Sequence, residues 1–252
     1  MPAPGIEIIA TPRYLAAIQP DFPIAGPNSV GWIRCASSEA AEVIREARAI
    51  FASRHLPFMW TIDPDAQPPD FAEHLARNGV HPDSHGAESQ VMVMSIDATV
   101  ESPPIKGLEI HDALADLETF RKADGAAVEA FEANMPAESP ESIAMQDRRR
   151  LNFRAQGNRH LLLATVDGEP AGAAGMGIFP PAAAILQGGA VRPQFRGRGI
   201  YRALVAARQE IARQANVDGL TVWGGHMSGP ILAGLGFEKV GWRRFYLDNS
   251  TV

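Results

Sequence analysis

Apolar residues in the first hundred positions recur with two different periods. Within residues 38–53 they follow helical spacing, at Ala41, Ile44, Ala47 and Phe51. A second helix is expected over 68–80, where Pro69 suits its first turn and Gly79 suits the left-handed residue after its end. Short apolar or alternating stretches that predict strands lie around these helices, at 29–35, 56–63 and 89–97. This order of strands and helices favours an α/β or mixed sheet layer over a helix bundle.

The second half of the chain predicts an antiparallel meander followed by a helix. A short strand over 108–111 and helices around 114–131 and 138–154 precede three strands, expected over 160–166, 170–179 and 183–191. Asp167 and Gly168 suit a two-residue hairpin turn between the first two of these strands. A further strand is expected over 220–223.

An uncharged run from Pro170 to Val191 has the length of a membrane span, but Pro180 and Pro181 interrupt it and Gln187 is polar. Two buried strands joined by a turn explain this run better. The N-terminal residues lack a basic segment followed by an apolar stretch, so no secretory signal is expected.

Pro103, Pro104 and Gly107 stop any regular element and predict a domain boundary near residue 103. Charge also divides there, because residues 1–105 carry a net charge of −7 and residues 106–252 carry +1. We therefore expect two units, residues 1–103 and 104–252. The total of −6 argues against a generally cationic surface for duplex nucleic acid. The single cysteine, Cys35, is expected in the core, and its isolation favours a reducing compartment, with the cytoplasm as the simplest location.

The segment after residue 191 carries the most informative chemistry. Ile200, Ala203, Leu204, Ala207 and Ile211 fall on one face of a predicted helix, and Arg202, Arg208, Gln209 and Arg213 on the polar face. Arginines gather where this helix begins, at 192, 196, 198 and 202. Because the start of a helix is already positive, such a cluster suggests an anionic ligand. Gly197 and Gly199 would let backbone N–H groups turn toward a phosphate or diphosphate. The segment has neither a P-loop lysine nor the glycine triplet of a dinucleotide fold.

Two segments resemble the GNAT superfamily of acyl-CoA-dependent N-acyltransferases. VRPQFRGRGIYRAL (191–204) looks like that family's strand, loop and helix signature, and ILAGLGFEKVG (231–241) looks like its closing helix and last strand. The resemblance covers roughly residues 106–252. It implies a mixed, largely antiparallel sheet flanked by helices, with two similar units in tandem. The first unit looks like the degenerate half of tandem members and is expected to carry no cofactor.

The resemblance also implies a donor, acetyl-CoA, and residues that bind it. Gly189, Ala190 and Val191 would lie on the splayed strand that pairs with the pantetheine arm. The diphosphate would accept N–H groups from Arg196, Gly197, Arg198, Gly199, Ile200 and Tyr201. The acceptor would be a primary amine of a small molecule or peptide, attacking directly in a ternary complex.

The sequence departs from the family pattern at two positions. Tyr201 stands where a small residue is usual, and Leu232 stands where a tyrosine often protonates the departing sulfur. Ser228 or His226 is a candidate to replace that acid through a water molecule. His226 is also the first candidate for the base, followed by Glu129 and Glu132.

Other readings remain open at this point. His81 and His85 lack a third ligand at a recognisable spacing, so no metal site is expected. One alternative function is an acyl-CoA-binding sensor or partner module without catalysis. Another is a reader of phosphate groups in nucleic acid or phosphoproteins, although neither nucleic acid nor membrane is the expected partner. The sequence does not indicate an oligomeric state.

Overall fold

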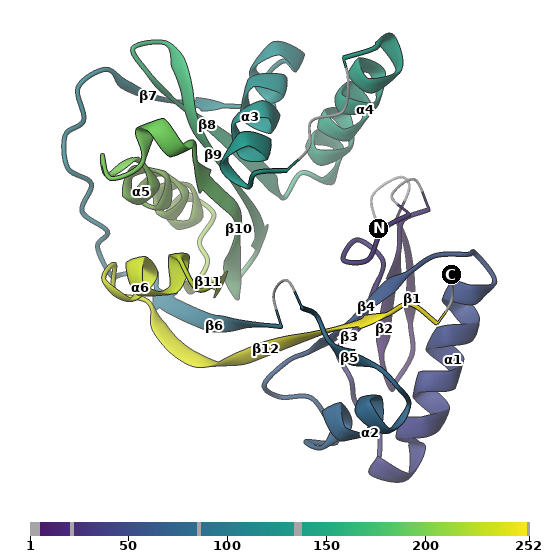
Figure 1. Ribbon diagram of the computed structural model, residues 1–252. Coiled ribbons are helices and arrows are strands. Elements are labelled where there is room, and N and C mark those ends of the chain that lie inside the picture. The colour runs from purple at the N-terminus through teal and green to yellow at the C-terminus, as the bar shows by residue number, and fades with distance from the viewer. Residues whose placement is uncertain (1–5, 21–22, 85–86, 134–137, 251–252) are drawn as a thin grey trace. The chain divides into compact units, whose positions relative to one another are not determined.

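The computed structural model describes residues 6–20, 23–84, 87–133 and 138–250 (Figure 1). By their contacts these residues form two compact units. Unit 1 contains Met1–Val91, Gly224–Met227 and Val240–Val252, and unit 2 contains Met92–Trp223 and Ser228–Lys239. The expected division into 1–103 and 104–252 differs from these units, because the C-terminal strand pairs with strands from the beginning of the chain.

Unit 1 is a sheet with two helices. Its strand order is β1 (Glu7–Ala10), β2 (Leu15–Ile18), β3 (Ser29–Gly31), β4 (Phe58–Ile62) and β12 (Glu238–Asp248), with β5 (His81–Pro82) also on β12. β3 and β4 are parallel and the other pairs are antiparallel. The helices are α1 (Ala40–Ala52) and α2 (Phe71–Arg77), with a short turn η1 (Ser37–Glu39) before α1.

The predicted elements of unit 1 are present, with two differences. The strand expected over 29–35 ends at Gly31, because Trp32 adopts a left-handed φ of 51° that an extended strand cannot contain. Strands β1, β2 and β5 were not predicted from the sequence. Gly79 has the expected positive φ, 76°, directly after the end of α2. His85 lies outside the described residues.

The core of unit 1 is aromatic. The rings of Phe51 and Phe58 stack at 4.3 Å between centroids, and Trp60 lies 5.4 Å from Phe58 and 5.7 Å from Phe71. All four residues are fully buried. Cys35 is also buried in this core, and burial raises the pKa of its thiol.

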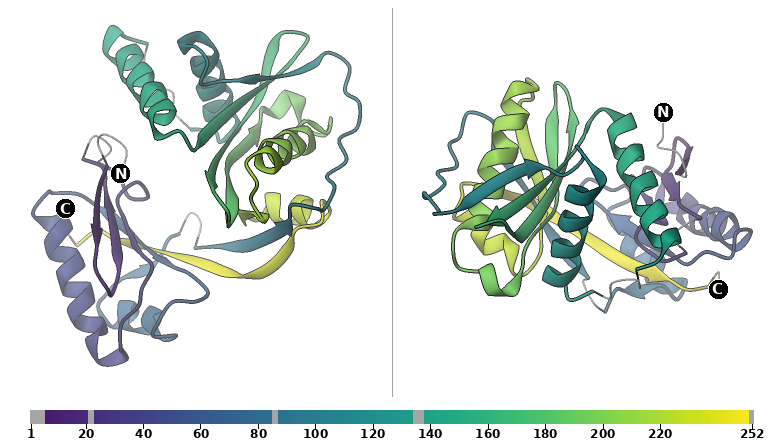
Figure 2. Two further views of the ribbon diagram at one scale, coloured as in Figure 1. Left: turned by 180° about the vertical axis from the view of Figure 1, so that it is seen from behind. Right: turned by 90° about the horizontal axis from the view of Figure 1, so that it is seen from above.

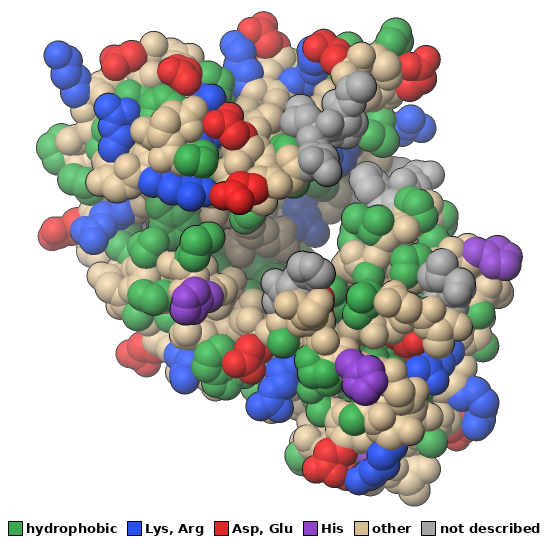
Figure 3. Space-filling view, viewed as in Figure 1, with side chains coloured by type: hydrophobic (Ala, Val, Ile, Leu, Met, Phe, Trp, Pro, Cys, Tyr) green, Lys and Arg blue, Asp and Glu red, His purple; other side chains and the backbone are tan. Residues whose placement is uncertain are grey.

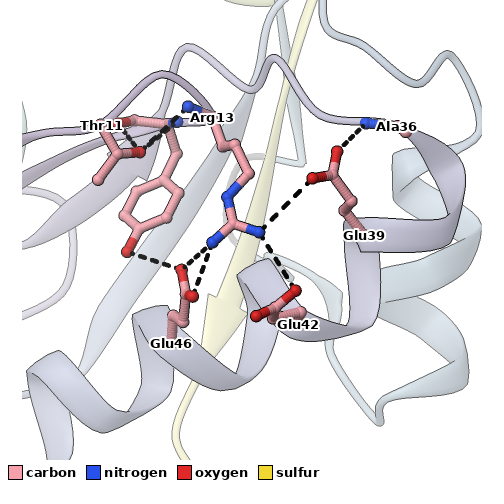
Figure 4. Close-up of polar contacts among 7 residues, drawn as sticks. Thr11, Arg13, Ala36, Glu39, Glu42 and Glu46 are labelled. Carbon is pink, nitrogen blue, oxygen red and sulfur yellow. Dashed lines mark hydrogen bonds and ion pairs between the residues drawn. The ribbon is translucent and has the colours of Figure 1, made fainter.

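One arginine fastens the β1–β2 turn to α1 (Figure 4). The Arg13 guanidinium donates to Glu46 at 2.7 Å and to Glu42 at 3.3 Å, and it forms an ion pair with Glu39 at 3.8 Å. The hydroxyl of Tyr14 donates to the same Glu46 carboxylate at 3.4 Å. Three carboxylates of neighbouring helical turns therefore share one cation, which joins the first hairpin to the helix.

Unit 2 is a largely antiparallel sheet with helices on both faces (Figures 1 and 2). Its strand order is β7 (Leu108–Asp112), β8 (Arg159–Val166), β9 (Glu169–Phe179), β10 (Ala183–Val191), β11 (Gly219–Gly224) and β6 (Glu88–Ser95). Each of the strands β7 to β10 pairs antiparallel with the next one along the chain, which confirms the predicted meander. β10 and β11 are parallel. The helices are α3 (Leu117–Ala130), α4 (Pro140–Gln156), α5 (Ile200–Gln214) and α6 (Ser228–Ala233), with a turn η2 (Pro193–Phe195) before α5.

The alternation of side chains along β8 places α3 and α5 on opposite faces of the sheet. Leu163 packs with Ala123 of α3, whereas Leu162 and Ala164 pack with Leu204 of α5. Asp167 and Gly168 have φ of 50° and 82°, as a two-residue hairpin between β8 and β9 requires. Residues 170–191 are thus two strands, and none of the helices in the described residues is long and apolar enough to cross a membrane.

Candidate functional site

A bulge interrupts β10 near its end. Gln187 pairs with Gly175 of β9, and the next pair is Ala190 with Ala173, so β10 uses one residue more than β9 over this interval. Gly188 within the bulge has a left-handed φ of 54°. The bulge turns the backbone of Gly189 out of the regular ladder.

Near this bulge β10 also stops pairing with its parallel neighbour β11. β10 pairs with β11 from Ala183 to Leu186, although β11 continues for two residues beyond the partner of Leu186, to Gly224. The edge of β10 from Gln187 to Val191 therefore extends past its parallel neighbour. Gly189, Ala190 and Val191, which the resemblance assigns to the donor, lie on this part of β10.

The turn that follows β10 presents free backbone donors. Gly197 and Gly199 have φ of 75° and 83°, and Gly199 is the residue from which α5 begins. Within the described part of the chain, the amides of residues 197–201 donate to no other protein atom. A Cβ at Gly197 would meet no atom within 4 Å, so the turn is open on that side. Five consecutive N–H groups, at the positive end of a helix, can receive an anion here.

Arg196 differs from its expected role. Its amide donates to the carbonyl of Pro193 at 3.2 Å, and its side chain donates to the carbonyls of Val191 and Ala130, at 3.2 and 2.9 Å. The amide is therefore occupied within the turn, because residues 193–196 close a single 3₁₀ turn. Arg196 fixes the end of β10 to the end of α3, and the free amides begin at Gly197.

The segment before β7 packs against the same turn. A Cβ at Gly199 would lie 2.9 Å from Cγ of Pro103 and 3.5 Å from Cδ1 of Ile105. Gln209 holds the preceding residues, since its Oε1 accepts from the amide of Val100 at 3.2 Å and its Nε2 donates to the carbonyl of Ala98. The segment at the predicted domain boundary is thus attached along α5, and Pro103 and Ile105 lie beside the turn.

The arginines at this end of α5 have different surroundings. Arg192 donates to Glu129 at 2.6 Å and to Glu169 at 2.9 Å, whereas Arg198 and Arg202 are exposed. The Arg198 guanidinium lies 5.5 Å from the centre of the Phe195 ring. No acidic residue occupies the first turn of α5. Two cations therefore remain at a positive helix end, where they favour a negatively charged ligand.

Tyr201 and Arg208 lie together behind the bulge. A Cβ at Gly189 would lie 3.1 Å from Cε2 of Tyr201 and 3.3 Å from Nη2 of Arg208. The sequence placed Arg208 and Gln209 on the polar face of α5, and this was wrong, because both are 1% exposed. Burial lowers the pKa of Arg208 to about 10 and raises that of the Tyr201 phenol.

The predicted catalytic residues lie at two places in the chain. Glu129, on α3, is held by Arg192, and hydrogen bonds from Arg192 and then Gln194 lower the pKa of its carboxyl group. Such a carboxylate is a weaker base than an ordinary one, which argues against Glu129 in that role. His226 is exposed in the turn after β11, and Ser228 begins α6. Glu132 is exposed with a φ of 54°, and residues 134–137 beyond it lie outside the described residues.

Leu232 has no exposed surface and belongs to the core of unit 2, with Val205, Leu220 and Phe237. The residue at this position therefore points into the protein. Arg208 could not be recognised from the sequence, because an arginine on an amphipathic helix is ordinarily assigned to the solvent face. The contact of Pro103 with the glycine turn was also missed, because the sequence indicates that prolines interrupt regular structure but not where the segment that contains them packs.

On the face drawn in Figure 3, basic and acidic side chains are interspersed, and neither sign forms a continuous patch there. The small net charge of residues 106–252 means that the positive charge of the turn at 197–202 is a local property.

The acetyltransferase (GNAT) family model matches residues 127–228, which include the bulge, the glycine turn and α5. None of the curated proteins matches the chain. Among solved structures, a GCN5-related N-acetyltransferase from Kribbella flavida is similar over 97% of this chain and 90% of its own, with a TM-score of 0.73 and 16% identity. A tandem GNAT protein from the clavulanic acid biosynthesis pathway is similar over 98% of this chain and 84% of its own, with a TM-score of 0.66 and 16% identity.

A GCN5-related N-acetyltransferase from Sphaerobacter thermophilus is similar as well, over 94% of this chain and 80% of its own, with a TM-score of 0.64 and 15% identity. At these identities the similarity shows the fold, and it extends over nearly the whole chain. The family model adds the sequence match in the segment that carries the site. Residues 127–228 therefore match the GNAT family, and the chain has the GNAT fold.

Proposed function

We propose that this protein is an N-acetyltransferase that transfers an acetyl group from acetyl-CoA to a primary amine of a small molecule or peptide. The observation that carries the proposal is the row of free amides from Gly197 to Tyr201, directly after a strand that separates from its neighbour. The GNAT family uses acetyl-CoA, and a diphosphate fits this turn because the side of Gly197 is open.

The residues of β10 would position the other end of the donor. Backbone groups of Gly189, Ala190 and Val191 lie on the strand edge beyond the last pair with β11. A pantetheine arm, which carries amide groups, would pair with this edge as an added strand does. A backbone N–H at the bulge would polarise the thioester oxygen as negative charge develops there.

In the transfer step the amine nitrogen forms a bond to the thioester carbon, and the carbon–sulfur bond breaks. The ammonium proton passes to a base, for which His226 is the candidate because its imidazole is exposed and can accept a proton. Since Leu232 is buried, protonation of the sulfur falls to a water molecule held by Ser228 or His226, or the thiolate leaves unprotonated. Proximity within a ternary complex supplies much of the acceleration.

The first unit would then be a degenerate GNAT half without a donor site, and the resemblance of nearly the whole chain to a tandem GNAT protein supports this assignment. An amine acceptor fits the family chemistry, and the acidic balance of residues 1–105 would favour the approach of a cationic one.

The proposal is tested by isothermal titration of the folded protein with acetyl-CoA, followed by a thiol-release screen over amines. Cys35 is buried, so the protein itself adds little background to a thiol assay. Saturable binding and amine-dependent release of CoA are expected. Absence of acetyl-CoA binding would remove the proposal.

The second candidate is an acyl-CoA-binding module without turnover. It is favoured by one observation, the burial of Leu232 where the family often has its acid. Tight acetyl-CoA binding without thiol release across a broad amine panel would select this function over the first.

A further inference from the structure

Arg208 is a charged side chain enclosed in the core of unit 2. It is 1% exposed, and among the described residues no carboxylate forms an ion pair with it. Its five N–H donors have two acceptors, the carbonyl of Leu204 at 2.9 Å from Nε and the carbonyl of Gly175 at 3.1 Å from Nη1. Burying an unpaired cation is unfavourable, so Arg208 at this position requires a reason other than stability.

The position of the guanidinium supplies that reason. Gly175 is the β9 partner of Gln187, the last residue of β10 before the bulge. A bulge disrupts the ladder and leaves backbone groups without strand partners. Nη1 of Arg208 donates to the carbonyl of Gly175 at this point, so a side chain of α5 is hydrogen-bonded to the strand beside the bulge.

The remaining edge of the guanidinium faces the bulge itself. Nη2 lies 3.3 Å from the place where a Cβ of Gly189 would be, and the Tyr201 ring covers the same residue at 3.1 Å. A Cβ at 189 would require these two side chains to move away by a few tenths of an ångström. A positive charge in low dielectric therefore lies directly behind the backbone that diverges from β11.

We propose that Arg208 is a positioning residue for acyl transfer. It maintains the bulge at Gly188 and Gly189 and makes the electrostatic potential there positive, which stabilises negative charge on the thioester oxygen. The inference rests on the proposed function and names a residue in α5 that acts through the backbone of β10. Arg208 touches neither the donor nor the acceptor, and its effect is on how strongly the bulge polarises a carbonyl that lies against it.

The test compares two arginines of the same helix. Arg208→Met removes the charge and both hydrogen bonds but keeps an unbranched apolar chain. Arg213→Met is the matched control, because Arg213 also donates to two backbone carbonyls, those of Ile96 and Ala98, but does so on the surface and away from the bulge. Arg208→Lys tests whether a cation alone restores the effect.

We expect Arg208→Met to lower kcat by about 10- to 100-fold, with the Kd for acetyl-CoA changed less than about threefold, since a weaker positive potential at the bulge acts on the transition state. Arg208→Lys should recover part of the loss, and Arg213→Met should retain the wild-type kcat. Thermal unfolding of Arg208→Met should stay within a few degrees of the wild type, because replacing a buried cation by an apolar chain of similar size costs little.

An infrared difference spectrum of bound [1-¹³C]acetyl-CoA gives a readout without turnover. The thioester carbonyl stretch should lie at lower frequency on the wild type than in solution, and Arg208→Met should move it back toward the free value. If Arg208→Met does not fold, the same spectrum and kcat are measured on Arg208→Lys, which should lie between the wild type and free acetyl-CoA.

The possible outcomes separate the two proposals. A wild type that does not bind acetyl-CoA contradicts the proposed function. A wild type that binds it, with a carbonyl frequency and kcat unchanged in the folded Arg208 variants, overturns the role of Arg208 alone. If the wild type binds without turnover, the carbonyl frequency still decides the role of Arg208.

Discussion

Nε of Arg192 lies 2.6 Å from Oε2 of Glu129, so the arginine that follows β10 is joined to the end of α3. This ion pair and the bond from Arg196 to the carbonyl of Ala130 fix the same two elements together. The start of the glycine turn is therefore held in place by its bonds to α3, and this fixes the orientation of the free amides that follow. The pair also has a chemical consequence for Glu129, because its carboxyl group is held in the ionised form.

Glu129→Gln should leave the acid limb of the pH profile of kcat/KM unchanged. The hydrogen bond from Arg192 lowers the pKa of the Glu129 carboxyl group, so this group stays ionised as the pH is lowered through the range in which a histidine titrates. His226→Gln, in contrast, should lower kcat/KM by about 10²-fold, as expected for loss of a general base, and remove that limb. Rates measured between pH 5 and 9 check both variants. Loss of the limb in Glu129→Gln would return the role of base to that carboxylate.

Gly197→Val should reduce acetyl-CoA affinity more than Arg198→Ala. Gly197 has a φ of 75°, which a β-branched residue adopts only with strain, so the substitution disturbs several amide donors at once. Removing one exposed arginine weakens a single screened contact. We expect a loss of more than about tenfold for Gly197→Val and about threefold for Arg198→Ala, measured by titration calorimetry.

A glycine in unit 1 provides the control for backbone strain. Gly79 has nearly the same φ, 76°, and, like Gly197, open space where a Cβ would lie. Gly79→Val should therefore cost stability by the same mechanism without changing acetyl-CoA affinity. Equal losses of affinity in the two variants would show that general destabilisation, and not the turn at 197, is being measured.

Leu232→Tyr should not restore the family's usual acid. Leu232 has no exposed surface and packs in the core of unit 2, so a tyrosine there would overfill the core and bury a hydroxyl group. We expect the free energy of unfolding to fall by about 1–3 kcal/mol, measured by urea denaturation, with no gain in kcat. A stable variant with a faster rate would mean that position 232 can reach the leaving sulfur.

Asp248→Asn should destabilise the protein at neutral pH. Burial alone would raise the pKa of this carboxyl group, but hydrogen bonds from Arg48 at 2.9 Å, Ser250 and Trp60 at 3.1 Å outweigh it and lower the pKa. A lowered pKa contributes stability above the unfolded value, about 3.9, and that contribution is lost as the pH falls through the folded value. The cost should be about 1–3 kcal/mol at pH 7 and should shrink below pH 4.

Urea denaturation of the wild type and Asp248→Asn at pH 7 and pH 3 measures this difference. Asp65→Asn is the control, because Asp65 also pairs with an arginine, Arg34, but its side chain is 71% exposed. Its effect should be small at both pH values. A cost of Asp248→Asn that does not change with pH would mean that shape, and not charge, makes Asp248 important.

The local elements of this protein could be predicted from its sequence because they depend on neighbouring residues. The hairpin at Asp167 and Gly168, the meander over 159–191 and the helix after Gly199 follow from alternation, turn chemistry and helical spacing. β1 and β2 were missed because each has only four residues and too few periods to be recognised.

The same distinction applies to the candidate site. The glycines of the turn are visible in the sequence because a left-handed φ favours one residue type, and this determined where an anion can approach. The occupied amide of Arg196, the pair of Arg192 with Glu129 and the burial of Arg208 were decided by tertiary structure. A polar side chain has the same hydropathy whether it faces water or donates to a backbone carbonyl of a strand far away in the sequence, so only packing in three dimensions distinguishes the two.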